Sequence, residues 1–372
     1  MAQVIGLLLG AITMIPMLES FIPDKTAQTT TIRIGAGTST DSKASTSGNT
    51  PGVRLFDVVG RSIAQKSGSS SRIADGSFSD IKLVAPDSVG GRQGQYLSVV
   101  SGGNDALCIS YIAVTWPDGG QQTWTGDIGV QCGGDWYESQ TIMDPSTNYM
   151  PKCMWIDSDG SNGIKTKGMG IHITDFTPSD DRAAQYQKDP PSMCGSQPRF
   201  WLYDDIDMKT CMPYFDPPLQ YTTGLTDMDR SKVVGVQGSK TCTNKKVRRG
   251  GTQAVSARRL ELPSINNTTS VNNIGNKLSS FLGKLITSNS TSHSAIRLCD
   301  SETSLGPDFV AHHENTYCDM MNKQSYPLCG RDNSTISTDC FDIMSKTLVP
   351  SEGLKRRDTP LPTKEYHTVT HW

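Results

Sequence analysis

Residues 107–116 read LCISYIAVTW, an uninterrupted run of apolar, aromatic and β-branched side chains. Turn-forming residues bound the run, with Gly103 and Asn104 before it and the sequence PDGG at 117–120 after it. This pattern is typical of a buried strand that enters a tight turn. We therefore predict a strand here, with a return strand over 122–128.

Similar short runs at 169–176 and 200–203 predict further strands. One short helix is expected near 177–187, because Thr177 is a good N-cap and Pro178 suits the first helical position. Many short strands separated by turns favour a mainly β fold, an antiparallel β-sandwich or jelly-roll-like domain with a short helix. A basic linker and a small helical, cysteine-rich C-terminal region are expected to follow it.

Composition shifts divide the chain into six expected segments. A helical period of apolar residues over 270–287 (Val271, Ile274, Leu278, Phe281, Leu282, Leu285 and Ile286) predicts an amphipathic helix that packs on the fold. The segments are a signal peptide (1–20), a Ser/Thr/Gly-rich linker with a short strand at 31–34 (21–50), a β-rich disulfide-bonded domain (51–221), a basic polar linker (222–269), the amphipathic helix with a cysteine-rich subdomain (270–345) and a disordered tail (346–372).

The first residues indicate export. The run VIGLLLGAITMIPML at 4–18 is too short to span a bilayer comfortably and resembles the apolar part of a signal peptide. No Lys or Arg precedes it, which departs from the usual pattern, and the alternatives are a buried helix or an uncleaved anchor. We predict a secreted, extracellular protein without stable membrane insertion.

The cysteines support the same compartment. Their number, 10, is even, and no pair has C-x-x-C spacing, so disulfides are favoured over metal or redox motifs; ten reduced thiols are the alternative. We predict pairing within two groups that the basic linker separates. The first group is Cys108, Cys132, Cys153, Cys194, Cys211 and Cys242, and the second is Cys299, Cys318, Cys329 and Cys340.

Two kinds of modification signal lie in the C-terminal third. Four sequons predict N-glycosylation, at Asn266, Asn267, Asn289 and Asn333. Dibasic sequences end at Arg249 and Arg259, where an exposed linker would admit a secretory-pathway protease; an uncut, solvated linker is the alternative. The net charge of -2, with only 19% charged residues, disfavours nucleic acid as a partner, while the oligomeric state stays open.

Four short segments carry a resemblance. They are SGNTPGVRLFD at 47–57, GNDALCISY at 103–111, WPDG at 116–119 and CGGDWY at 132–137. Over roughly residues 1–220 the chain resembles a group of secreted proteins of filamentous fungi that mostly carry no assigned function. The resemblance implies a fungal, secreted protein and supplies no catalytic residues to carry over to this chain.

Motifs of common hydrolases and nucleotide-binding proteins are absent, including G-x-S-x-G, H-E-x-x-H and the P-loop. A hydrolase triad would need His172 or a histidine of the C-terminal part. Asp175 could orient His172, but three residues apart on a strand the two would face opposite ways. A glycosidase needs two carboxylates across a cleft. Asp127, Asp135, Glu138 and Asp157 are the candidates, although their spacing selects no pair.

The sequence DSDGSNG at 157–163 has oxygen-bearing side chains at Asp157, Asp159 and Ser161, as in the first half of a calcium loop. The sixth position is Asn162 instead of Gly and the twelfth is Gly168 instead of Glu. A hairpin turn explains the same residues with fewer assumptions. Calcium is thus the one cofactor considered, and no other is expected.

The sequence DWYE at 135–138 places two aromatic rings between two carboxylates, as sugar-binding surfaces do. Asp135, Trp136, Tyr137 and Glu138 are therefore the candidate ligand-binding residues, with Trp136 and Tyr137 partly exposed. The favoured function is a noncatalytic secreted protein that binds a glycan or cell-surface ligand. The alternative is a secreted, glycosidase-like hydrolase with an Asp-based active site.

Overall fold

The computed structural model describes residues 22–25, 28–37, 46–85, 94–177, 192–195, 198–204, 212–216, 218–219, 233–236, 276–330, 338–351 and 361–372. The chain divides into two compact units, the first formed by Met1–Thr38 with Thr46–Asn276 and the second by Ser39–Ser45 with Lys277–Trp372. The described part is mainly β with few helices, as expected. Each unit is described by itself below.

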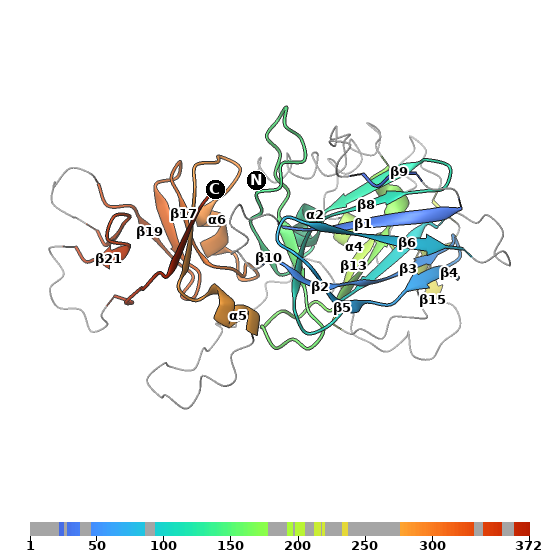
Figure 1. Ribbon diagram of the computed structural model, residues 1–372, viewed down its shortest axis with the longest axis horizontal. Helices are drawn as coiled ribbons and strands as arrows, with labels where there is room; N and C mark the ends of the chain where they lie inside the picture. Colours follow the sequence, from blue (N-terminus) through green and yellow to red (C-terminus); the bar gives the residue numbers. More distant parts are fainter. Residues whose placement is uncertain are drawn as a thin grey trace. The chain divides into compact units, whose positions relative to one another are not determined.

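The first sheet of the N-terminal unit is built around the predicted strand, β8 (Leu107–Thr115), in which all nine residues are buried. One edge of β8 pairs with β1, and the other pairs with β9 and β11, all antiparallel (Figure 1). The remaining strands extend the sheet in the order β10-β11-β8-β1-β6. Their bounds are β1 Thr29–Ala36, β6 Phe78–Val84, β9 Gln121–Thr125, β10 Trp136–Tyr137 and β11 Cys153–Ile156.

β1 corrects the linker expected over 21–50. The expected short strand at 31–34 is an eight-residue strand that lies between β6 and β8. Ile32 and Ile34 are 0% exposed because their side chains enter the core. The Thr residues beside them are β-branched and suit a strand as well as a linker, so composition alone misassigned the segment.

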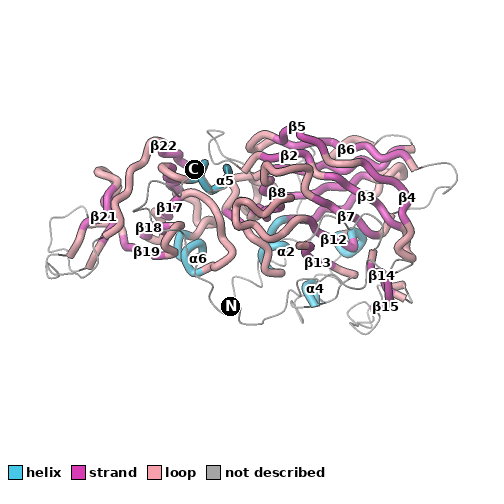
Figure 2. The backbone as a smooth tube through the Cα atoms, turned by 90° about the horizontal axis from the view of Figure 1, so that it is seen from below, coloured by secondary structure: helices cyan, strands magenta, loops and turns pink. Residues whose placement is uncertain are grey.

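A second antiparallel sheet has the order β13-β12-β7-β3-β4, and Figure 2 shows these strands side by side. Leu97, Ile171 and Leu202 from this sheet belong to the same buried cluster as Ile32 and Ile112 from the first sheet. The two sheets therefore share one hydrophobic core. Their bounds are β3 Gly52–Phe56, β4 Ser62–Lys66, β7 Tyr96–Val100, β12 Gly168–His172 and β13 Phe200–Tyr203.

Smaller elements complete this unit. Two ribbons pair β2 (Gly48–Thr50) with β5 (Ser69–Ile73) and β14 (Pro213–Phe215) with β15 (Val233–Val236). The expected return strand is split into β9 and helix α2, and the expected strand over 169–176 into β12 and a 3-10 turn. The helical bounds are α2 Gly126–Gln131, η3 Ile173–Phe176 and α4 Ser192–Gly195. Of the helix expected near 177–187, all but Thr177 lies outside the described residues.

Four disulfides confirm the predicted partition for the eight cysteines that the structure describes. Cys108–Cys153 joins β8 to β11, and Cys132–Cys194 joins α2 to α4. Cys299–Cys318 and Cys329–Cys340 lie in the C-terminal unit. Cys211 and Cys242 lie outside the described residues. Each bridge closes a loop inside one unit, which lowers the entropy of the unfolded chain.

The C-terminal unit is mostly β, which corrects the expected helix over 270–287. Helix α5 (Asn276–Phe281) ends before Gly283, whose φ of 67° is unfavourable for other residues. β16 (Lys284–Ser288) follows and pairs in parallel with β17 on one edge and β22 on the other. Leu285 and Ile286 are consecutive and both buried, because a strand paired in parallel on both edges is enclosed on both faces. The same two residues also fitted the apolar face of the expected helix.

The rest of this unit consists of antiparallel hairpins and one helix. The sheet order is β19-β18-β17-β16-β22, and β20 pairs with β21. In three hairpin turns a residue other than glycine has positive φ, namely Asn315, Lys323 and Lys346. The bounds are α6 Ala295–Asp300, β17 Asp308–Ala311, β18 Thr316–Asp319, β19 Gln324–Pro327, β20 Cys340–Asp342, β21 Thr347–Val349 and β22 Thr368–His371.

β21 and β22 correct the disordered tail expected over 346–372. Lys284 to Thr287 of β16 pair with Thr368 to His371 of β22. Tyr366 and Val369 pack against the buried cluster that contains Leu285 and Tyr317. β22, which is distant in sequence from β16, completes the sheet. The polar sequence of the tail contains no local pattern that predicts this pairing.

We expect a chain truncated after Tyr366 to lose stability, because β16 loses one of its two neighbours. Exposing one buried aliphatic side chain such as Leu285 costs roughly 1.5–3 kcal/mol. Chemical denaturation followed by circular dichroism measures the loss. Thr363→Ala, in an exposed part of the same segment, is the control. Equal stability of the truncated chain and this control would show that the tail does not stabilise the unit, as expected of a disordered tail.

Candidate functional site

The predicted ligand-binding residues are buried, which corrects their expected exposure. Trp136 is 1% and Tyr137 0% exposed, and Asp135 and Glu138 are also buried. β10 carries both rings and pairs with β11, where Trp136 lies opposite Met154. Rings enclosed in this way cannot stack on an external sugar. The two aromatic residues between two acidic residues at 135–138 belong to a buried polar cluster and not to a binding surface.

A lysine that the sequence interpretation missed lies at the centre of this cluster. Lys152 Nζ is 3.6 Å from Glu138 Oε2 and 3.9 Å from Asp127 Oδ1, and all three side chains are buried. The same Nζ lies 5.7 Å from the centre of the Trp136 ring. One buried cation thus balances two carboxylates, as an internal charge requires.

The four carboxylates considered for a glycosidase are all buried in the protein interior. The Tyr149 hydroxyl donates to Asp127, whose pKa is raised by burial, an effect that Lys152 and Tyr149 offset only in part. Asp135 Oδ2 accepts the Lys165 amide at 3.0 Å. Asp157 is 0% exposed. These contacts stabilise the fold and offer no carboxylate to an external substrate.

The predicted calcium loop follows β11 directly. Asp157 Oδ2 accepts from Asn162 Nδ2 at 2.8 Å, and Asp159 Oδ1 accepts from the Ser161 amide at 2.9 Å. Asp157 is buried, whereas Asp159 and Ser161 are exposed. Among the described residues no group of three or more His, Cys, Asp or Glu side chains is arranged to hold a metal ion, so any site here would depend on other oxygen donors.

His172 and Asp175 meet, which corrects the prediction that they face opposite ways. β12 ends at His172, and the 3-10 turn η3 redirects the chain, so His172 Nδ1 lies 3.0 Å from Asp175 Oδ2. Asp175 Oδ1 accepts from Arg199 Nη1 at 3.2 Å. The other ring nitrogen of His172, Nε2, lies 3.0 Å from Thr174 Oγ1.

The His172 ring lies between two polar groups. Asp175, which is paired with Arg199, lies beside Nδ1, and the Thr174 hydroxyl is hydrogen-bonded to Nε2, where the tautomer decides which atom donates. The order hydroxyl, imidazole, carboxylate is that of a hydrolase triad. The His172 ring is 2% exposed and lies against Tyr96 and Phe215, whereas Thr174 is half-buried.

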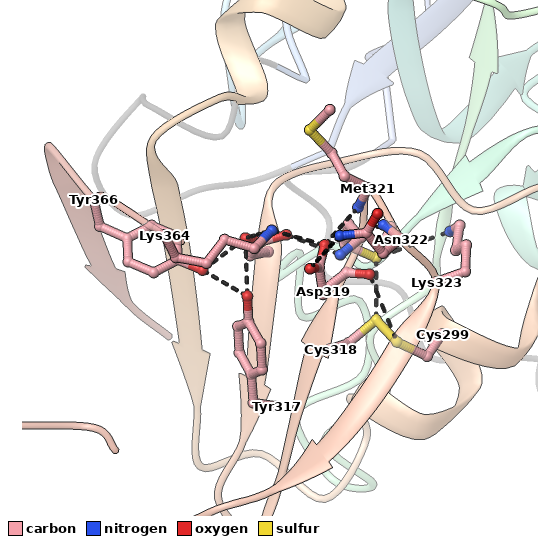
Figure 3. Close-up of polar contacts among 11 residues, drawn as sticks. Cys299, Tyr317, Cys318, Asp319, Met321, Asn322, Lys323, Lys364 and Tyr366 are labelled. Carbon is pink, nitrogen blue, oxygen red and sulfur yellow. Dashed lines mark hydrogen bonds and ion pairs between the residues drawn. A yellow bond between two sulfur atoms is a disulfide. The ribbon is translucent and has the colours of Figure 1, made fainter. Parts of the chain in front are cut away.

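The C-terminal unit has its own buried polar network (Figure 3). Lys364 Nζ lies 2.7 Å from Asp319 Oδ1 and 3.0 Å from Asp308 Oδ2. Burial acts to lower the pKa of Lys364, but the two carboxylates outweigh it and raise this pKa. Tyr317 and Tyr366 both donate to Asp308. The network joins β17, β18 and the segment before β22 and is structural in character.

Lys323 lies nearby without an acidic partner among the described residues. Its Nζ donates to the Ser304 carbonyl at 2.7 Å and to the Leu298 carbonyl of α6 at 3.3 Å. Burial lowers the pKa of Lys323 to about 8. The contacts with carbonyls at the end of a helix explain its position.

Of the predicted modification sites, the structure describes Asn289 alone. Asn289 is exposed in the loop after β16, where an enzyme can reach it. Asn266, Asn267, Asn333, Arg249 and Arg259 lie outside the described residues. Within the described ranges, no helix is both long and apolar enough to cross a membrane.

Comparisons with known proteins do not assign the chain. No protein-family model and no curated protein matches it.

We expect Lys152→Met to destabilise the N-terminal unit by about 3–5 kcal/mol, because two buried carboxylates lose their cation. Equilibrium unfolding in denaturant measures the change. Lys66→Met, at an exposed position of β4, is the matched control and should lie within about 0.5 kcal/mol of the wild type. Equal stability of the two variants would show that Lys152 does not balance Asp127 and Glu138.

Proposed function

We propose that this protein is a secreted, disulfide-bonded glycoprotein that binds a glycan or cell-surface ligand without catalysis. Bridges in both units and the mainly β fold fit an oxidising compartment. The observation that carries the noncatalytic part is the enclosure of Asp127, Asp135, Glu138 and Asp157 in the interior. The shared core of the two sheets supports a β-sandwich architecture.

The ligand-binding surface is proposed on the outer face of β6. Phe78 is the only strongly exposed Phe, Tyr or Trp among the described residues, at 45%. Arg33 of β1 lies over its ring, 3.8 Å from the centre. Two hydrogen bonds of 2.7 and 2.8 Å join the same guanidinium to Asp80. An exposed ring beside a fixed guanidinium and carboxylate offers the stacking and hydrogen bonding that a sugar needs.

β6 is an edge strand whose exposed side chains lie on one face. Phe78, Asp80, Lys82 and Val84 are exposed, while Ile81 and Leu83 point into the core. The Asp80 ion pair raises the pKa of Arg33, so the guanidinium keeps its charge. Ile81 and Leu83 fix the strand in the core, and the exposed side chains of β6 take no part in that core.

Glycosylation and processing are proposed for the C-terminal third. Exposure of Asn289 supports a glycan there. Cleavage after Arg249 or Arg259 would leave Cys211 and Cys242 on the N-terminal side of the cut, and the four described bridges each lie within one unit. No described disulfide would then join the two products.

We expect Phe78→Ala to weaken binding on a glycan array about 30-fold, because a central aromatic contact contributes roughly 2 kcal/mol. Thermal stability should change little, since the ring is exposed. Met344→Ala, at an exposed apolar residue of the C-terminal unit, is the control. The proposal fails if the purified glycoprotein binds no glycan, or if both variants bind as the wild type does.

Hydrolysis is the second candidate function, and one observation favours it. Thr174, His172 and Asp175 lie in the order of a nucleophile, base and orienting group, with 3.0 Å between Thr174 Oγ1 and His172 Nε2 and 3.0 Å between His172 Nδ1 and Asp175 Oδ2. A site of this kind acts on esters or other acyl groups and not on glycosidic bonds. Here the hydrolase alternative rests on an imidazole and no longer on paired carboxylates.

If this second function is correct, the protein hydrolyses p-nitrophenyl esters, and His172→Gln and Thr174→Ala each lower kcat/KM about 100-fold or more. Thr174→Ser should keep activity, since it retains the hydroxyl. Thr123→Ala on β9 is the control for general effects. A wild-type protein that releases neither p-nitrophenol nor reducing sugar would leave the binding function alone.

A further inference from the structure

The loop after β11 holds an imbalance of charge that the proposed function does not use. The Asp157 amide donates to the Thr166 carbonyl at 2.9 Å, which closes the loop. Inside it, Gly160 and Gly163 adopt φ values of 69° and 75° that favour glycine. The chain therefore turns sharply between Asp157 and Thr166, which lie opposite each other at the base of the loop.

Two carboxyl groups lie two residues apart in this loop. Asp157 Oδ2 accepts from Asn162 Nδ2 at 2.8 Å, and Asp159 Oδ1 accepts from the Ser161 amide at 2.9 Å. Neither carboxylate forms an ion pair with Lys, Arg or His among the described residues. Neighbouring carboxylates without a cation repel each other.

Two buried side-chain oxygen atoms of this loop have no hydrogen-bond partner in the described structure. They are Asp157 Oδ1 and Thr166 Oγ1, and both residues are 0% exposed. A backbone hydrogen bond joins Asp157 to Thr166, so the two residues are neighbours across the base of the loop. A buried carboxylate oxygen without a donor is costly, and a bound cation would remove that cost.

We infer that this loop binds a calcium ion through Asp157, Asp159 and Thr166. All the available donors are oxygen atoms, which Ca²⁺ prefers, and backbone carbonyls and water complete such sites. The ion would cancel the repulsion between the carboxylates and satisfy Asp157 Oδ1. This loop is not an EF-hand, because Asn162 and Gly168 replace the Gly and Glu of that motif, and closure through Thr166 takes the place of the missing glutamate.

Calcium is favoured over magnesium by the form of the loop. Mg²⁺ demands octahedral geometry and keeps several waters, whereas Ca²⁺ accepts irregular sets of side-chain and carbonyl oxygens. A site with few carboxylates in an extracellular module binds Ca²⁺ with a Kd on the order of 10⁻⁴–10⁻³ M. This affinity suits an extracellular fluid and makes the ion a stabiliser of the N-terminal unit, independently of ligand binding at β6.

Isothermal titration of the full-length, chelator-treated protein with CaCl₂ tests the inference. We expect one site with a Kd on the order of 10⁻⁴–10⁻³ M, at least tenfold weaker binding for Asp159→Asn, and a rise in Tm with calcium that this variant lacks. Asp159 is exposed, so this variant retains the fold, and Asp157→Asn serves as a second variant. Asp118→Asn is the matched control, because Asp118 Oδ1 also accepts a turn amide, from Gly120 at 2.8 Å.

Three results would overturn the inference. The first is an absence of calcium binding by the wild type, and the second is an unchanged Kd in Asp159→Asn. The third is equal stabilisation by MgCl₂, which would show a nonspecific charge effect.

Discussion

The N-terminal unit depends on β8, a strand enclosed on both faces and paired on both edges. β1 covers one edge, and β9 and β11 share the other. Its side chains reach the core common to both sheets, through Ile112 and Val114, and the opposite cluster with Met143, through Tyr111 and Ala113. Cys108 then ties β8 to β11 covalently. A polar substitution in β8 would meet no solvent on either face.

Both units solve the same problem of buried charge in the same way. Lys152 lies between Asp127 and Glu138, and Lys364 lies between Asp308 and Asp319. His172 and Arg199 share Asp175. Each cluster pairs cations with carboxylates and adds hydrogen bonds, as burial demands. The loop at 157–163 differs because its carboxylates find no cation among the described residues, which is why it points to an ion.

Function follows from which polar groups are left at the surface. The acidic and aromatic residues that resemble a sugar-binding patch in sequence serve the interior, while Phe78 and Asp80 are exposed and are held by the mostly buried Arg33 side chain. Thr174 is half-buried beside an oriented imidazole. The binding and hydrolytic proposals therefore concern different elements, β6 and η3, and experiments on one do not disturb the other.

The sequence by itself determined the mainly β character of the fold, the strand at 107–115 and the partition of the eight described cysteines. These features depend on local composition and on spacing along the chain, so no partner needs to be known. Only the tertiary structure decided that Trp136 is core, because β11 covers it. It also decided that β16 is a strand between β17 and β22, and that η3 turns Asp175 back to His172. Burial and strand pairing depend on segments that are distant in sequence. Hydrophobic periodicity indicates that one face of a segment is buried, but it does not identify the segment that covers that face.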